Sequence, residues 1–317
     1  MKTPAFLPRR PPPDPYDPKI YLLPNLMTAG NLFCGFAATL KIISGTLVGL
    51  PLQAAAAATE NRVGEGLWSP EAVDQFHAAI WFILAACVFD VLDGRLARLG
   101  GHDSPFGREF DSLADIVSFG VAPALLVYKI VLYEFGKVGL VIAFLYLACG
   151  ALRLARFNCI AASSDADGGA QASPAEKGKP FKGVPIPAAA GVIASLTELL
   201  LWFDEGRRDL GAWKFALPPL MVFLAMMMFS RFRYPSFKAL NWRTQRTVPA
   251  LLVILVLILL TVQFYQWMPA VIFLSYLLYG FLRPWLSLSW RRSIEEEIGE
   301  EHDASDEEPD EGDAREV

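Results

Sequence analysis

Four aspartates lie close together between two apolar runs of the chain: Asp90, Asp93, Asp111 and Asp115. The members of each pair are three or four residues apart, so on a helix each pair shares one face. Two such pairs on neighbouring helices can converge into one site. Ionised carboxylates at a membrane boundary repel one another and lose hydration, and a divalent cation offsets both effects. Oxygen ligands without Cys or His favour Mg²⁺, Mn²⁺ or Ca²⁺ over zinc, and four carboxylates are enough for two ions.

Small residues and one arginine accompany the aspartates. Gly94, Ala97 and Gly107 leave room for a ligand against the helix backbone, and Arg98 adds a fixed cation suited to phosphate oxygens. Together with metal ions, these residues describe a site for phosphoryl transfer from a pyrophosphate-type substrate. The alternative is a set of aspartates that cap helices and form ion pairs, but four caps would not need glycines at these offsets.

The stretch resembles the signature of the CDP-alcohol phosphatidyltransferase family at all eight positions, Asp90-x2-Asp93-Gly94-x2-Ala97-Arg98-x8-Gly107-x3-Asp111-x3-Asp115. The resemblance implies an enzyme in which an alcohol displaces CMP from a CDP-activated lipid, with Mg²⁺ or Mn²⁺. It implies that the first three aspartates bind metal and that Asp115 is both a ligand and the base for the incoming hydroxyl. It also implies a CDP site lined by Gly94, Ala97, Arg98 and Gly107.

Segments outside the signature bear on the acceptor alcohol. Residues 24–36, 119–123, 150–158 and 181–191 resemble the membrane-embedded phosphatidylserine synthases. This resemblance implies that CDP-diacylglycerol and serine are the substrates. The other kind of phosphatidylserine synthase uses paired H-x-K-x4-D motifs, which this sequence lacks, so we expect direct attack by the serine hydroxyl. Glycerol 3-phosphate or an inositol phosphate is the alternative acceptor, and either would need more cationic side chains near the site.

Four polar residues are candidates for binding the acceptor or a lipid phosphate. Arg153 and Arg156 share a helix face, and arginines within a membrane need partners, such as the serine carboxylate and a phosphate. Asn158 offers both a donor and an acceptor to a zwitterion, and Lys182 suits a phosphate. The alternative is that the arginines follow the positive-inside rule and bind headgroups non-specifically.

Two functions from other classes would require features that differ from those of this sequence. A cation-coupled transporter would place its acids near mid-bilayer and contain an inverted repeat, whereas these aspartates lie at a helix end and no repeat is visible. An inactive scaffold would normally have lost an aspartate. We expect CDP-diacylglycerol, serine and membrane lipids as partners and no nucleic acid. The family is often dimeric, so a homodimer is considered, although no sequence feature identifies an interface.

The elements that must position these residues are apolar helices. The chain has 317 residues, of which 54% are hydrophobic, and a mean hydropathy of +0.35, so we predict an all-α polytopic membrane protein. Leu50–Phe76 is read as a polar connection between the first two spans. We expect about eight transmembrane helices, at about residues 23–47, 78–97, 111–132, 138–157, 184–203, 216–232, 248–265 and 267–288.

The charge distribution divides the chain and orients it. Residues 1–22 are expected to be an extended cytoplasmic segment, 23–247 a six-helix catalytic core, 248–288 an additional hairpin and 289–317 an acidic disordered tail. Most lysines and arginines fall on the side of both termini and the aspartates, which places that side in the cytoplasm. We therefore expect a multi-pass protein of the cell membrane with a cytoplasmic active site.

Two single polar residues complete the expectations. Asn31 lies within the first apolar span, and we expect it to form a hydrogen bond between helices rather than contact substrate. His77 is expected to be interfacial and solvated.

Overall fold

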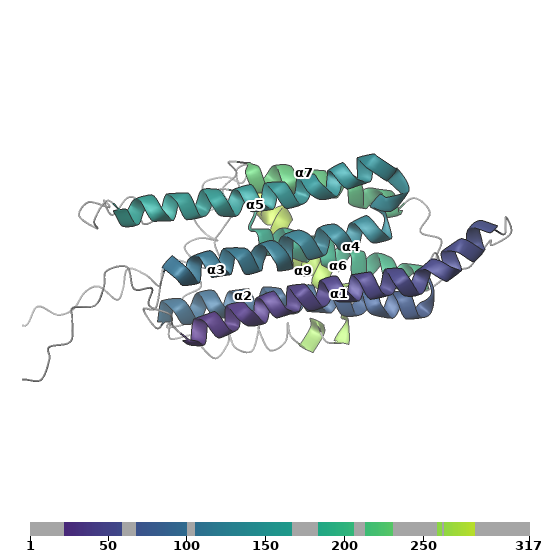
Figure 1. The fold of residues 1–317 in the computed structure, drawn as a ribbon, viewed down its shortest axis with the longest axis horizontal. Coiled ribbons are helices and arrows are strands. Elements are labelled where there is room, and N and C mark those ends of the chain that lie inside the picture. Colours follow the sequence, from purple (N-terminus) through teal and green to yellow (C-terminus); the bar gives the residue numbers. More distant parts are fainter. Residues whose placement is uncertain are drawn as a thin grey trace, which may run out of the picture.

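The protein is described here by a computed structural model, which covers residues 22–58, 68–99, 105–166, 183–205, 213–230, 259–261 and 263–282. In these ranges every regular element is helical. The helices lie roughly parallel or antiparallel along the long axis of the molecule (Figure 1). The predicted all-α architecture is therefore confirmed for this part of the chain.

Helices α1 (Leu22–Ala58) and α2 (Pro70–Leu99) form an antiparallel pair with the most extensive contact in the bundle. Both helices reach into the predicted polar connection at Leu50–Phe76, so that connection is shorter than expected. A run of alanines with high helix propensity carries α1 onward. At the start of α2, Ser69 Oγ accepts a hydrogen bond from the Ala72 amide (3.2 Å). Ser69 therefore caps the helix, whose first residue is Pro70.

The third membrane segment is interrupted by a wide turn. It consists of α3 (Pro105–Asp115), a π-helical turn (Ile116–Val121) and α4 (Ala122–Ile130), which follow one another without a break. Ser118 Oγ in the turn donates to the Asn31 carbonyl on α1 (2.9 Å). The Tyr146 hydroxyl on the following long helix donates a hydrogen bond to the Phe119 carbonyl (3.1 Å). The turn, which follows Asp115 directly, is therefore attached to helices on both sides.

The remaining helices complete the bundle around this segment. They are α5 (Gly136–Ala166), α6 (Ile186–Glu205), α7 (Leu217–Phe229) and α9 (Met268–Leu282). Helix α5 packs against α7, and α6 packs against both α2 and α9. Glycine permits the contact of α6 with α9, because a Cβ at Gly191 would lie 2.2 Å from the Phe273 ring.

Among the described residues, five helical segments are long and apolar enough to cross a membrane: Asn25–Gly49, Pro70–Arg95, Phe106–Ile130, Leu132–Ile160 and Ile186–Phe203. They match the first five predicted spans. The sixth and the last predicted spans correspond to the shorter apolar helices α7 and α9, and the predicted span at 248–265 lies mostly outside the described residues. The protein is membrane-embedded, and the count of eight spans stays a prediction.

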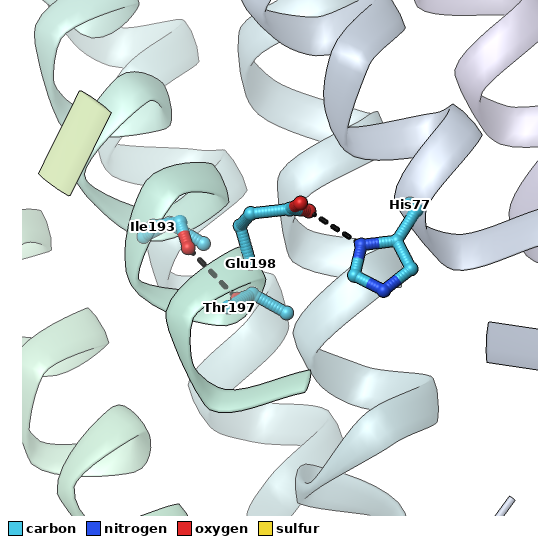
Figure 2. A network of polar contacts seen from close by, with 4 residues as sticks. All are labelled: His77, Ile193, Thr197 and Glu198. Carbon is cyan, nitrogen blue, oxygen red and sulfur yellow. Dashed lines mark hydrogen bonds and ion pairs between the residues drawn. The ribbon is translucent and has the colours of Figure 1, made fainter. Parts of the chain in front are cut away.

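A polar contact between His77 and Glu198 joins α2 to α6 inside the bundle (Figure 2). His77 Nδ1 lies 2.8 Å from Glu198 Oε2, and the Glu198 side chain is only 1% exposed. The neighbouring Thr197 is satisfied within its own helix, where its hydroxyl donates to the Ile193 carbonyl (2.8 Å). His77 is 20% exposed, so it keeps some access to solvent as expected, but its ring also contacts a buried carboxylate of α6, which was not expected.

Candidate active site

The predicted site lies near one end of the bundle, at the left of Figure 1. Asp90 and Asp93 belong to the last part of α2, and Asp111 and Asp115 to α3. The first turns of α1 and the last turns of α5 reach the same end. The carboxylates of α2 and α3 therefore lie at the end of the bundle that α1 and α5 also reach.

Three of the four aspartates form a compact cluster. Asp90, Asp111 and Asp115 each place a carboxylate oxygen so that all three oxygens lie within 4.8 Å of one another. Asp90 and Asp111 are half-buried, and Asp115 is buried at 6% exposure. Carboxylates this close repel one another unless a cation or protons lie between them. A trio of hard oxygen donors without Cys or His fits Mg²⁺ or Mn²⁺.

Asp93 lies outside this trio and has a partner on another helix. Its side chain is 5% exposed, and its Oδ2 accepts a hydrogen bond from the Thr28 hydroxyl on α1. The expected convergence of four carboxylates is therefore divided into a group of three and one aspartate that is held separately.

Helix α1 also contacts the trio. Asn31 Nδ2 donates to Asp115 Oδ1 (3.0 Å), so the predicted hydrogen bond between helices is confirmed. Sequence reasoning did not connect Asn31 or Thr28 with the aspartates. A signal was present, because two polar residues three apart on an apolar helix share a face and need partners when buried.

The two glycines of the signature, Gly94 and Gly107, lie in different surroundings. A Cβ at Gly94 would meet no described residue within 4 Å, so the backbone of α2 is open to a ligand on this part of the structure. Gly107 is half-buried in the first turn of α3. Ala97 and Arg98 belong to the last turns of α2, but their side chains lie outside the described part of the chain.

Three of the four candidate acceptor residues lie within two turns of α5, but their surroundings differ. On α5, Arg153 is half-buried and its charge interacts with those of Asp115 and Asp90. Arg156, one turn later, is exposed. Asn158 Nδ2 contacts Glu109 Oε2 (3.1 Å) and Ser112 Oγ (3.0 Å), so Asn158 connects α5 to α3. Lys182 lies outside the described residues.

Comparison with known proteins agrees with this arrangement. The model of the CDP-alcohol phosphatidyltransferase family matches residues 21–273, a range that includes all four aspartates. The chain belongs to the CDP-alcohol phosphatidyltransferase family. This confirms the resemblance inferred from the eight-position signature.

Among curated relatives of this CDP-alcohol phosphatidyltransferase is the CDP-diacylglycerol–serine O-phosphatidyltransferase of Helicobacter pylori strain 26695. It is 36% identical over 273 residues, which cover 85% of this chain and 93% of the relative. The Mycobacterium leprae protein with the same name is 46% identical over 129 residues, or 41% of this chain and 40% of the relative. An archaetidylserine synthase of Methanothermobacter thermautotrophicus is 35% identical over 161 residues, or 50% of this chain and 58% of the relative.

Proposed function

We propose that the chain transfers the phosphatidyl group of CDP-diacylglycerol to L-serine, which gives phosphatidylserine and CMP. The observation that carries the proposal is the trio Asp90, Asp111 and Asp115, whose oxygens lie within 4.8 Å of one another inside the region that the family model matches. The choice of serine rests on relatives named for it, one of which aligns over 93% of its length. The archaeal relative is also named for a serine product.

In this reaction one bond forms and one breaks. The serine hydroxyl oxygen bonds to the phosphorus that carries the diacylglycerol, and the bond from that phosphorus to the bridging pyrophosphate oxygen breaks. CMP leaves with the bridging oxygen. Asp115 takes the hydroxyl proton, a role that suits a buried carboxylate beside the other two aspartates of the trio.

The four aspartates are the proposed metal ligands. Asp90, Asp111 and Asp115 would supply oxygens to one ion, and Asp93 would serve a second ion. Mg²⁺ or Mn²⁺ bound there would stabilise the negative charge on the phosphoryl oxygens and on the departing CMP. The open backbone at Gly94 gives the CDP moiety access to α2, and Ala97, Arg98 and Gly107 complete the proposed CDP site.

The proposed acceptor position is next to Arg153. This arginine is half-buried close to the charges of Asp90 and Asp115, so a serine held by its carboxylate would present its hydroxyl near the proposed base. Arg156 and Lys182 are then assigned to lipid phosphates. Asn158 would have to exchange its contacts with Glu109 and Ser112 to reach serine, so its role is to keep α3 against α5.

The charge asymmetry of the sequence supports placing this end of the bundle at the cytoplasmic face of the cell membrane, with both termini on the same side. A diacylglycerol tail can then remain in the bilayer while the CDP head meets soluble serine. The proposed organisation keeps 23–247 as the catalytic core and 248–288 as an added hairpin. A homodimer is compatible with this arrangement.

The test is CMP release by purified protein supplied with CDP-diacylglycerol and Mn²⁺ or Mg²⁺. Serine, glycerol 3-phosphate and inositol phosphate are offered separately, each with and without EDTA. We expect release with serine alone and none in EDTA. Release only with another acceptor would keep the reaction class and reject serine, and no release with any acceptor would reject the proposal.

A further inference from the structure

We propose that helix α1 positions the site through two residues, Thr28 and Asn31, each of which orients a different carboxylate. This inference rests on the proposed function, because it assigns roles toward the same metal-binding carboxylates. The two residues are three apart on α1, so they point to the same side of the helix. Both are almost completely buried, at 1% and 0% exposure.

Asn31 fixes the rotation of Asp115. Its Nδ2 donates to Oδ1 of the carboxylate over 3.0 Å. The hydrogen bond therefore distinguishes two oxygens that would otherwise be equivalent. We assign proton transfer from the acceptor hydroxyl to Oδ2, whereas Oδ1 is held by α1 and keeps a second lone pair for an ion shared with Asp90 and Asp111.

Asn31 is itself held by a contact with the membrane segment that carries Asp115. Its backbone carbonyl accepts the hydrogen bond from Ser118, which belongs to the π-helical turn directly after Asp115. The two backbones are so close that a Cβ at Gly35 would lie 2.6 Å from the Ser118 Cα. Asn31 thus contacts both α3, at Asp115, and the π-helical turn, at Ser118. These two contacts restrict rotation of the Asp115 carboxylate.

Thr28 orients the carboxylate of Asp93, the aspartate outside the trio. Its hydroxyl donates to Asp93 Oδ2, and both side chains are buried between α1 and α2. Groups that hydrogen-bond to metal ligands fix the ligand orientation, and their loss typically weakens metal binding or activity by about 10–100-fold. Thr28 is therefore a positioning residue for the metal ligand Asp93, and Asn31 is one for the proposed base.

The two roles predict different effects. Thr28→Val keeps the side-chain shape and removes the donor, so we expect Mn²⁺ binding to weaken by about 10–100-fold, as judged by electron paramagnetic resonance of the free ion. Thr28→Ser should restore binding. Asn31→Leu should lower kcat for CMP release by about 10–100-fold while KM for CDP-diacylglycerol stays within about twofold.

The matched control is Thr46→Val on the same helix, because Thr46 donates to the Ile42 carbonyl of its own helix (2.8 Å) and lies far from the site. It should bind Mn²⁺ and turn over as the wild type does. Unfolding temperatures measured in EDTA report folding without metal. If Thr28→Val does not fold, Thr28→Ala tests the same loss of the donor.

Three results would overturn the inference. These are wild-type Mn²⁺ affinity in both donor-free variants of Thr28, failure of Thr28→Ser to restore binding, or unchanged kcat in Asn31→Leu. Failure of the proposed function looks different. In that case the wild type itself releases no CMP with serine, while the Mn²⁺ measurements still report whether Thr28 orients Asp93.

Discussion

At the scale of single residues, Asp115 differs from the other members of the trio in its burial and in the donor that holds it. It is buried, whereas Asp90 and Asp111 are half-buried, and it accepts the hydrogen bond of Asn31. A base must be placed firmly relative to the proton that it removes. Asp115 therefore meets the requirement for the base better than its two neighbours.

Replacement of Asp115 by Asn should lower CMP release by at least about 10²–10⁴-fold, because the amide keeps the shape but cannot accept the proton. Metal binding should also weaken, since one of three clustered oxygens changes its charge. Size-exclusion profiles in detergent should match those of the wild type. Asp74→Asn is the control, because Asp74 is exposed on α2 and lies 16 residues before Asp90. Normal turnover by Asp115→Asn would remove Asp115 as the base.

The sequence was informative about these residues to different degrees. The spacing of the aspartates predicted shared helix faces, and three of the four carboxylates do meet. The sequence could not predict that Asp93 turns instead to Thr28, because that contact depends on how α1 packs against α2. Asn31 was expected to reach another helix, but its target could not be predicted without knowing which residue of α3 faces it.

At the scale of helices, the contact of His77 with Glu198 ties α2 to α6 far from the aspartates (Figure 2). His77 precedes Asp90 by 13 residues on α2, which corresponds to about 20 Å along a helix. Within the described part of the chain, Glu198 Oε1 has no hydrogen-bond partner, so His77 supplies the carboxylate with its main polar contact. The contact should matter for stability and not for chemistry.

His77→Leu should lower the free energy of unfolding by about 1–3 kcal/mol, because it leaves the buried carboxylate without this partner. His77→Leu combined with Glu198→Leu should recover much of that loss, since no buried charge remains. Thermal unfolding in detergent provides the measurement. Asp74→Asn, an exposed change on α2, should stay within about 0.5 kcal/mol of the wild type. A double variant less stable than His77→Leu would contradict this account.

Helix boundaries show what local sequence does and does not determine. The apolar runs located the spans, but the prediction placed a polar connection where α1 continues and α2 has already begun. The alanines extend α1 and the Ser69 cap starts α2. Neither effect depends on hydrophobicity, so the hydropathy pattern could not predict them. The π-helical turn at Ile116–Val121 was not expected, because it is stabilised by Ser118 and Tyr146 contacts with other helices.

At the scale of the whole molecule, the site draws residues from α1, α2, α3 and α5, so ion binding should stabilise the bundle. We expect Mn²⁺ at about 100 times its Kd to stabilise the folded protein by about 2.7 kcal/mol. EDTA should reverse the effect. Asp115→Asn should show a smaller shift under the same conditions. An unfolding temperature that does not respond to Mn²⁺ would argue against an ion held between helices.

The orientation of the molecule can be tested with its own cysteines. Cys159 is the exposed one among the four, and it lies near the end of α5 that reaches the aspartates. A membrane-impermeant maleimide should label it in inside-out vesicles and not in intact cells. Cys159→Ser should abolish that labelling. Labelling in intact cells would place the site on the opposite face of the membrane.

The wide turn after Asp115 makes the length of the chain there as important as its composition. Each residue advances an α-helix by about 100°, so deletion of one residue from Ile116–Val121 would rotate all of α4 relative to Asp115. The side chains that α4 now buries would face lipid, although every local preference for helix would remain satisfied. A substitution in this stretch changes one side chain and keeps the register of α4, whereas a single-codon deletion would misalign half of a membrane segment.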